Sequence, residues 1–448
     1  MIYYKKNGGN KIIMKKLTAI VIGAGGRGMG YTKIMHDMED KFELVGIAEP
    51  VPERVEFELS HFPNVPKENI YDTWEKILDR PKFADFALIA TQDQMHIGPA
   101  LKAIELGYDI LLEKPIAPTA EECKKIAEAA KAKGVKVLVC HVLRYTPLYG
   151  TLKKLLDEGK IGRLMSVQAL EPVGNRHMAH SFVRGKWGNS DTSCPMILAK
   201  CCHDTDIIQW LVGSPCKKVS SFGNLSYFTK ENKPEGAPSR CTEDCPHREN
   251  CVFDVKKLYM DNEYMGGSWF RETATDSVNV TDEQMWASLQ ETNYGTCIYE
   301  ANNNVVDHQI VNMEFENGAT ASLTMTAFSP DGAGRAIRLF GTEGMLEVTG
   351  SGSNILYTKF GQRVKNQWGD KVSEEIDFRS NGNDVTSGHG GGDAGLLYAL
   401  YEYFTGTYTG NAASTAEISY LNHLISFGAE ESRVTDKVID IKEYSKNL

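Results

Sequence analysis

Val-Ile-Gly-Ala-Gly-Gly-Arg-Gly, residues 21–28, ends one apolar segment and begins a region that can form a helix. The apolar run 17–23 is typical of a buried parallel strand, and a helix can follow from residue 28 onward. The same order then repeats along the chain. Further strands are expected at 42–48, 86–90, 109–112 and 136–140, and helices at 52–59, 73–78, 96–106 and 119–133. This alternation predicts a parallel sheet with helices on both faces.

Three glycines in this stretch form a G-x-G-x-x-G pattern. Gly23 permits the tight turn, Gly25 allows a pyrophosphate to approach the backbone, and Gly28 lets the helix pack closely on the strand. The helix N-terminus offers free N–H groups and a partial positive charge to phosphates. Because the pattern follows a strand and opens a helix, it predicts a Rossmann dinucleotide-binding domain over residues 15–145.

The second expected strand ends at Glu49. An acidic side chain at this place can accept hydrogen bonds from the ribose hydroxyls of NAD, and it repels the 2′-phosphate of NADP. Arg27 and Arg54 are close in sequence to these elements, and either could bind that phosphate. NAD is therefore the expected cofactor, and NADP stays open.

Two further strand ends place polar residues at the edge of the sheet where ligands bind. Thr91 and His96 follow the third strand as expected walls of the nicotinamide pocket, although His96 could instead be exposed at a helix start. Lys114 follows the fourth strand, where it could face a cleft and share a proton with a substrate hydroxyl, or else lie at the surface. The expected cofactor site comprises Gly23, Gly25, Gly26, Arg27, Gly28, Glu49, Thr91, His96, Glu113 and Lys114.

Beyond residue 145 the pattern changes, and a second domain is expected over residues 146–448. Strands are expected at 164–170, 305–315, 320–327 and 336–341, and helices at 148–158, 203–211, 395–404 and 415–430. Asn317-Gly318 separates two of these strands, which is typical of a β-hairpin. We expect an α+β domain with a large, mostly antiparallel open sheet and a Cys-containing insertion at about 229–295. An open sheet face suggests a homo-oligomer, a dimer or tetramer.

Charge and hydropathy argue against several classes of protein. The chain has 448 residues, 42% of them hydrophobic, and a formal net charge of −10, which is unlike a nucleic-acid-binding protein. No apolar run approaches the ~18 residues of a membrane helix, and the basic N-terminus lacks the apolar core of a secretory signal. A cytoplasmic location is expected, with the ten cysteines reduced.

Cys241, Cys245 and Cys251, with His247 between them, are the one metal-like cluster in the sequence. Their spacing differs from the shorter pairs that are common in zinc sites. Metal binding there stays open beside the simpler interpretation of reduced thiols, and no catalytic metal is expected.

Four motifs together resemble those of the glucose–fructose oxidoreductase / inositol dehydrogenase / MocA (Gfo/Idh/MocA) family. They are residues 23–28, Glu113-Lys114-Pro115, Arg144-Tyr145-Thr146-Pro147 and Cys202-His203-Asp204-Thr205-Asp206. The resemblance runs from about residue 15 to 445. It implies a Rossmann domain followed by an α/β domain whose open sheet often mediates oligomers. It also implies hydride transfer between NAD(P) and a hydroxyl-bearing carbon of a sugar, glycoside or cyclitol.

The resemblance also implies roles for single residues. Lys114 matches the family's lysine that contacts substrate and assists proton transfer, and His203 matches its acid/base histidine. A structural histidine at a helix start is the alternative for His203. Many members carry an aspartate four residues before this histidine, where this chain has Ala199. That role is either vacant or taken by Lys200 or Asp206.

Other polar residues are expected near the substrate. In the polar segment 171–188, His177, His180 and Trp187 could contact a sugar, although each could also be structural. The Gly-rich turn 387–393 could place His389 near substrate, or it could simply cap the following helix. The expected substrate-binding residues are Arg144, His177, His180, Trp187, Lys200 and Asp206.

Two other functions stay open at the level of sequence. Some proteins that resemble this family keep NAD bound and cleave glycosides without net redox change. A non-catalytic nucleotide sensor is the other possibility, but the presence of both Lys114 and His203 argues against it, since a pure binder needs neither. Fold alone does not separate these classes.

Overall fold

The computed structural model describes residues 15–261, 268–350, 352–364, 368–381 and 388–448, so the basic N-terminus lies outside the described residues. The chain divides into two compact units. The first contains the residues up to 117, 121–146 and 384–420, and the second contains 118–120, 147–383 and 421–448. The first unit therefore includes a segment from near the C-terminus.

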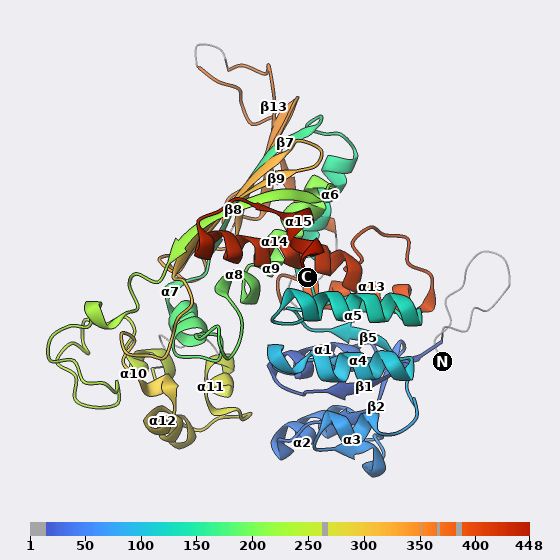
Figure 1. Cartoon of the computed structure of the whole chain (residues 1–448), viewed down its shortest axis with the longest axis vertical. Coiled ribbons are helices and arrows are strands. Elements are labelled where there is room, and N and C mark those ends of the chain that lie inside the picture. The colour runs from blue at the N-terminus through green and yellow to red at the C-terminus, as the bar shows by residue number, and fades with distance from the viewer. Residues whose placement is uncertain (1–14, 262–267, 351, 365–367, 382–387) are drawn as a thin grey trace. The chain divides into compact units, whose positions relative to one another are not determined.

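The first unit is built on a six-stranded sheet whose paired strands all run parallel. Its order is β3-β2-β1-β4-β5-β6, in agreement with the predicted Rossmann fold (Figure 1). The strands are β1 (Leu17–Ile22), β2 (Phe42–Ala48), β3 (Ile70–Tyr71), β4 (Phe86–Ile89), β5 (Asp109–Leu112) and β6 (Val137–Val139). The helices are α1 (Gly26–Asp37), α2 (Pro52–His61), α3 (Trp74–Leu78), α4 (Ile97–Leu106), α5 (Ala120–Lys133) and α13 (Gly392–Thr405).

Alternating strand residues build the core of this unit. Val21, Leu88 and Leu111 point to one side of the sheet, where they join Met35 of α1 and Leu397 of α13 in one buried cluster. Helix α1 contacts α2 and α13, whereas α3 contacts α4. A late segment of the chain thus completes the hydrophobic core beside the nucleotide-binding loop.

The second unit contains a nine-stranded sheet of order β14-β13-β12-β11-β7-β10-β9-β8-β15. All neighbours are antiparallel except β7 and β10, which are parallel. The predicted hairpin is confirmed, because β9 and β10 pair across residues 316–318. The strands are β7 (Leu164–Pro172), β8 (Cys216–Asn224), β9 (His308–Phe315), β10 (Thr320–Thr326), β11 (Ala336–Gly341), β12 (Gly344–Val348), β13 (Asn354–Lys359), β14 (Glu374–Asp377) and β15 (Ile439–Asp440).

Helices cover one face of this sheet. Helix α9 contacts β7 and β10, and α15 contacts β8. Strand β9 shows the resulting alternation, since Val311 and Met313 are buried while Ile310 and Asn312 are exposed. The helices are α6 (Pro147–Asp157), α7 (Asn175–His177), α8 (Met196–Ala199), α9 (Cys202–Val212), α10 (Val255–Tyr259), α11 (Ser268–Thr275), α12 (Asp282–Glu291), α14 (Ala416–Thr435) and α15 (Ile441–Lys446).

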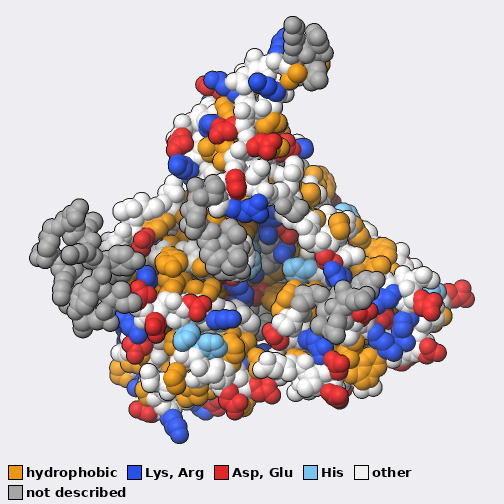
Figure 2. All heavy atoms as spheres, turned by 180° about the vertical axis from the view of Figure 1, so that it is seen from behind, with side chains coloured by type: hydrophobic (Ala, Val, Ile, Leu, Met, Phe, Trp, Pro, Cys, Tyr) orange, Lys and Arg blue, Asp and Glu red, His pale blue; other side chains and the backbone are white. Residues whose placement is uncertain are grey.

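Two segments are more regular than their sequence suggests. The expected insertion contains α10, α11 and α12, and the expected polar loop after β7 contains α7 and a π-helical turn at Met178–Val183. No helix among the described residues is long and apolar enough to span a membrane. On the face seen in Figure 2, basic and acidic side chains are interspersed among hydrophobic ones.

Candidate active site

The glycine-rich loop lies between β1 and α1. Gly23 has φ of 86°, and a Cβ atom built on it would lie 2.8 Å from the carbonyl oxygen of Ala90. A Cβ on Gly28 would lie 2.2 Å from the carbonyl oxygen of Gly23. Side chains are thus excluded at both positions by close backbone contacts. At Gly26, by contrast, a Cβ would meet nothing within 4 Å, so the backbone at the start of α1 is open. This cradle fits a pyrophosphate.

Glu49 reaches from the end of β2 into this loop. Its Oε2 accepts a 2.7 Å hydrogen bond from the N–H of Ala24, and its Oε1 accepts one of 3.0 Å from the N–H of Val51. The Arg54 guanidinium lies 3.5 Å from Oε1. The carboxylate is therefore fixed beside the glycines, as its predicted role in binding a ribose requires.

Thr91 and His96 follow β4. The Thr91 hydroxyl oxygen is buried and has no hydrogen-bond partner among the described residues, which fits a polar group of a bound cofactor. The His96 ring is fully buried, with Nδ1 2.8 Å from the carbonyl oxygen of Pro115 and Nε2 3.1 Å from that of Thr91. The exposed alternative for His96 is therefore wrong. The ring links the segments that follow β4 and β5, because its two nitrogens contact one carbonyl oxygen in each segment.

Arg27 is bound by residues of its own unit. Its Nε donates a 2.8 Å hydrogen bond to Glu113, and its Nη1 and Nη2 atoms lie 3.1 and 2.8 Å from the two carboxylate oxygens of Asp393. Tyr31 donates a 2.9 Å hydrogen bond to Glu113, and its ring lies 4.5 Å below the guanidinium. The guanidinium charge is thus already balanced by two carboxylates, so Arg27 is a poor candidate for binding a 2′-phosphate.

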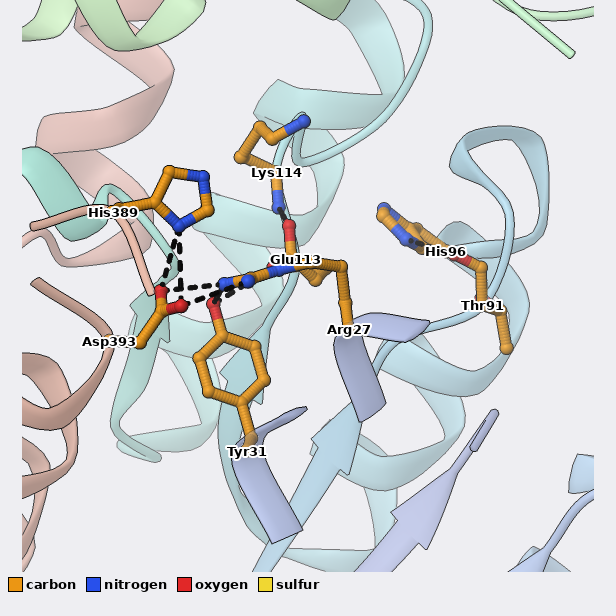
Figure 3. Close-up of polar contacts among 8 residues, drawn as sticks. All are labelled: Arg27, Tyr31, Thr91, His96, Glu113, Lys114, His389 and Asp393. Atoms are coloured by element: carbon orange, nitrogen blue, oxygen red, sulfur yellow. Dashed lines mark hydrogen bonds and ion pairs between the residues drawn. The ribbon is translucent and has the colours of Figure 1, made fainter. Parts of the chain in front are cut away.

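Lys114 and His389 adjoin this network (Figure 3). The backbone N–H of Lys114 donates a 2.8 Å hydrogen bond to Glu113 Oε2. His389 Nδ1 lies 3.1 Å from Asp393 Oδ1. The Lys114 side chain and the His389 ring lie on the same side of the Arg27 guanidinium in Figure 3. The backbone of the predicted Lys114 therefore lies next to the Glu113 carboxylate, to which Arg27 also donates.

The charges in this network favour the ionised form of both carboxylates. Burial alone would raise the pKa of Glu113, but the charges of Arg27 and Lys114 lower it below the usual value. Burial also acts to raise the pKa of Asp393, yet hydrogen bonds from His389 and Arg27 hold it well below the usual value. The two anions therefore persist at neutral pH and keep Arg27 in place.

The predicted His203 lies in the second unit, at the start of α9, and is buried. The adjacent Asp204 accepts hydrogen bonds of 2.7 and 3.3 Å from Arg335. Arg335 also lies 2.6 Å from Glu171, which in turn lies 3.6 Å from the Lys200 amine. Burial raises the pKa of Asp204 to about 6 and lowers that of Lys200. Lys200 thus belongs to a compact cluster of charged groups that includes Asp204, the residue after His203.

Two predicted substrate contacts are buried. Asp206 is fully buried and accepts a hydrogen bond from Asn422 of α14, so it ties α9 to α14. Arg144 is 3% exposed within the turn Val142–Tyr145 of the first unit. Both side chains are buried, and their contact with a substrate stays a prediction.

The residues of the segment after β7 pack with aromatic rings. His180 is fully buried, stacks on Phe270 at 4.1 Å and lies 2.9 Å from the Tyr259 hydroxyl through Nδ1. Burial lowers its pKa to about 3. The expected sugar contact by His180 is therefore not supported, since an aromatic cluster surrounds the ring. His177 and Trp187 are half-buried beside Phe182.

Among the described residues, no group of three or more His, Cys, Asp or Glu side chains is arranged to hold a metal ion. This includes Cys241, Cys245 and Cys251, all of which are free thiols. Cys241 Sγ instead lies 3.5 Å from the carboxylate of Asp254. The interpretation of these cysteines as reduced thiols stays a prediction.

Some residues of these networks have no signal in the sequence pattern. Asp393 lies 366 positions from Arg27, and Arg335 lies 131 positions from Asp204. For the Arg27–Asp393 pair, the one local signal in the sequence is the glycine run before α13. Nothing near Arg335 in the sequence points to a buried cluster.

Two family models match the chain. One, described as "Oxidoreductase family, NAD-binding Rossmann fold", matches residues 17–141. The other, described as "Oxidoreductase family, C-terminal alpha/beta domain", matches residues 153–416. Together they cover most of the chain. The glycine-rich loop described above therefore belongs to an NAD-binding Rossmann domain.

Curated relatives and solved structures agree with these matches. The chain is 24% identical to the protein YteT of Bacillus subtilis (strain 168) over 87% of this chain and 89% of that one. It is 27% identical to scyllo-inositol 2-dehydrogenase (NAD(+)) of the same organism, over 46% of this chain and 55% of that one. The structure of scyllo-inositol dehydrogenase from Lactobacillus casei with bound NAD(H) and scyllo-inositol is similar in fold, with a TM-score of 0.61 and 16% identity over 96% of this chain and all of that one.

Proposed function

Because the chain belongs to the Gfo/Idh/MocA family of NAD-binding oxidoreductases, we propose that it transfers a hydride between NAD and a hydroxyl-bearing carbon of a sugar, glycoside or cyclitol. One observation carries the proposal furthest. The glycine-rich loop, which binds the cofactor, is joined through Arg27 and Glu113 to Lys114, the expected substrate residue. An inositol is the first substrate to test, since 2-dehydrogenases of inositol are among the relatives.

The division of tasks follows from the chemistry of the residues. The glycine-rich loop holds the pyrophosphate of NAD, and Glu49 binds its adenosine ribose. NAD, when bound, supplies the hydride acceptor. Lys114 binds and polarises the reacting hydroxyl, and His203 removes its proton with the help of Lys114. The 3.6 Å contact of the Lys200 amine with Glu171 supports Lys200 as the residue that assists His203 in the role of the missing aspartate.

The location and assembly of the protein belong to the same proposal. All ten cysteines are free thiols, which supports a reducing, cytoplasmic location. The uncovered face of the nine-stranded sheet supports a homo-oligomer.

A panel assay tests the proposed reaction. The purified protein and NAD are incubated with inositols, free sugars and chromogenic glycosides, and both NADH and released aglycone are measured. NADH without aglycone establishes a dehydrogenase and identifies its substrate class. Aglycone without net NADH contradicts the proposal and supports a redox-neutral glycosidase, whereas NAD binding without either product supports a sensor.

Lys114→Ala and His203→Ala are each expected to lower turnover of the best panel substrate by about 10²–10⁴-fold, because each removes a group that moves the hydroxyl proton. NAD affinity, measured by calorimetry, should stay within a few-fold of the wild type for His203→Ala. Lys76→Ala, on an exposed part of α3, serves as the control. Near-normal turnover in either variant would remove that residue from the mechanism.

A further inference from the structure

The first unit contains an imidazole–carboxylate pair that the proposed function does not use. His389 Nδ1 lies 3.1 and 3.2 Å from the two carboxylate oxygens of Asp393. The Asp393 side chain is 7% exposed, whereas that of His389 is 37% exposed. A carboxylate at Nδ1 holds a proton on that nitrogen, which places the lone pair of the neutral ring on Nε2. The pair therefore has the arrangement of a proton acceptor that is accessible to water.

This pair is connected to Lys114 by charged groups. Asp393 is bound by Arg27, Arg27 donates to Glu113, and Glu113 accepts the backbone N–H of Lys114. The connection is short and mostly buried, because both carboxylates are less than a tenth exposed. His389 is thus held at a fixed place relative to the backbone of the expected substrate residue.

The backbone at His389 is also unusual. Its φ of 55° lies in the left-handed region, and it is followed by Gly390 and Gly391, which also have positive φ. A residue other than glycine seldom adopts this conformation, and such strain is concentrated at functional sites. Glycine would fit here with less strain, so the histidine contributes its side chain at a cost to the backbone.

We propose that His389 is a proton-transfer residue that carries the proton released at Lys114 to water. The inference rests on the proposed function. When the substrate is oxidised, the C–H bond breaks and its hydrogen leaves with both electrons to oxidised nicotinamide. The O–H bond breaks as well, a C=O bond forms, and the proton, removed by His203, passes to Lys114. His389 accepts this proton at Nε2, becomes an imidazolium ion in contact with Asp393, and releases the proton to water.

The first test uses His389→Gly, which suits the left-handed backbone and therefore keeps the fold. In dilute buffer, the first turnover of NADH formation should match the wild type, because the initial proton acceptors remain. Steady-state turnover should fall about 10²-fold, since later turnovers wait for the proton to leave. Added imidazole should restore it. Asparagine also tolerates this backbone conformation. The steady-state turnover of His389→Asn should fall equally, but imidazole should not restore it, because the asparagine side chain occupies the space that imidazole would enter.

His308→Asn is the matched control. His308 Nδ1 lies 2.7 Å from Asp307, so this variant removes another partly exposed imidazole–carboxylate pair, on β9 of the second unit. It should leave steady-state turnover and its imidazole dependence unchanged. Wild-type turnover in His389→Gly, or a loss that imidazole does not restore, would overturn the proposal. Absence of NADH formation by the wild type would instead contradict the proposed function.

A second readout needs no turnover. Nitrogen-15 spectra of the histidine rings, with the His389 signal identified from His389→Asn, should show the proton on Nδ1 in the neutral wild-type ring. Asp393→Asn should shift this ring toward a mixture of the two tautomers. A wild-type ring with its proton on Nε2 would contradict the assigned direction of proton transfer.

Discussion

At the end of β2, the carboxylate of Glu49 has two backbone donors, the N–H groups of Ala24 and Val51, and is 4% exposed. The Glu49 carboxylate cannot move away from a second negative group without losing both hydrogen bonds. The 2′-phosphate of NADP would therefore meet a fixed carboxylate. Arg54, the nearest cation, is already 3.5 Å from that carboxylate.

Glu49→Gln is accordingly expected to lower NAD affinity by about tenfold and to narrow the difference between NAD and NADP, because it removes the charge and keeps the shape. Calorimetric titration with each cofactor measures both effects. Glu53→Gln, on the exposed first turn of α2, should change neither affinity. An unchanged ratio of NAD to NADP affinity in Glu49→Gln would show that this carboxylate does not set the preference.

Residues whose role is local were predictable from the sequence. Gly23, Gly28 and Glu49 follow from a strand–turn–helix pattern within one stretch of chain, and the structure places them together. The partner of Arg27 was not predictable, because Asp393 is 366 positions away. For His180 the prediction itself was misleading. The polar segment suggested an accessible histidine, but the ring is buried among aromatic rings contributed by a later segment.

Helices α1 and α2 meet through a buried carboxyl group. Thr32 of α1 donates a 2.8 Å hydrogen bond to Glu58 Oε1, and Glu58 Oε2 is buried with no hydrogen-bond partner among the described residues. Burial raises the pKa of Glu58 from 4.5 to about 7, and the charge of Glu49 adds to the rise. The ionised form is therefore costly in the folded state.

The sign of the pH effect follows from this shift. A carboxyl whose pKa is higher when folded stabilises the fold below its unfolded pKa, and this contribution is lost as the pH rises through about 7. Glu58→Gln should therefore raise the free energy of unfolding at pH 8, by on the order of 2–3 kcal/mol, with little effect near pH 4.5. Urea denaturation at both pH values measures this, with the exposed Glu56→Gln as control. An equal effect at both pH values would contradict the assignment.

Helices and strands with a clear hydrophobic periodicity in the sequence were predicted correctly, and those without it were missed. The β9–β10 hairpin follows from alternating residues around Asn317-Gly318, and helix α4 ends as expected at Gly107, which has φ of 84°. The helices of the insertion, which have five, eight and ten residues, were not predicted, because such short helices show too few residues for a hydrophobic period. Strand β8 was missed as well, since one of its faces is exposed and carries lysine and serine.

Across the nine-stranded sheet, an apolar row crosses four neighbouring strands on the uncovered face. Phe222 pairs with Ile310, Ile310 with Thr324, and Thr324 with Leu170. Phe222 is 63% exposed, Ile310 39% and Leu170 37%. Polar side chains of the same strands, among them Ser166, Asn312 and Lys218, line a neighbouring part of the sheet. A flat surface with an apolar centre and a polar rim is typical of an interface between identical chains.

We therefore expect the protein to self-associate through this face, with Phe222 and Ile310 at the centre of the contact. Ile310→Glu should convert the oligomer to a monomer, because a symmetric interface would bury the new charge twice. Sedimentation velocity measures the change in mass. Val252→Glu alters another exposed apolar residue, outside the sheet, and should leave the mass unchanged. A wild type that sediments as a monomer, or an Ile310→Glu oligomer of unchanged mass, would exclude this face as the interface.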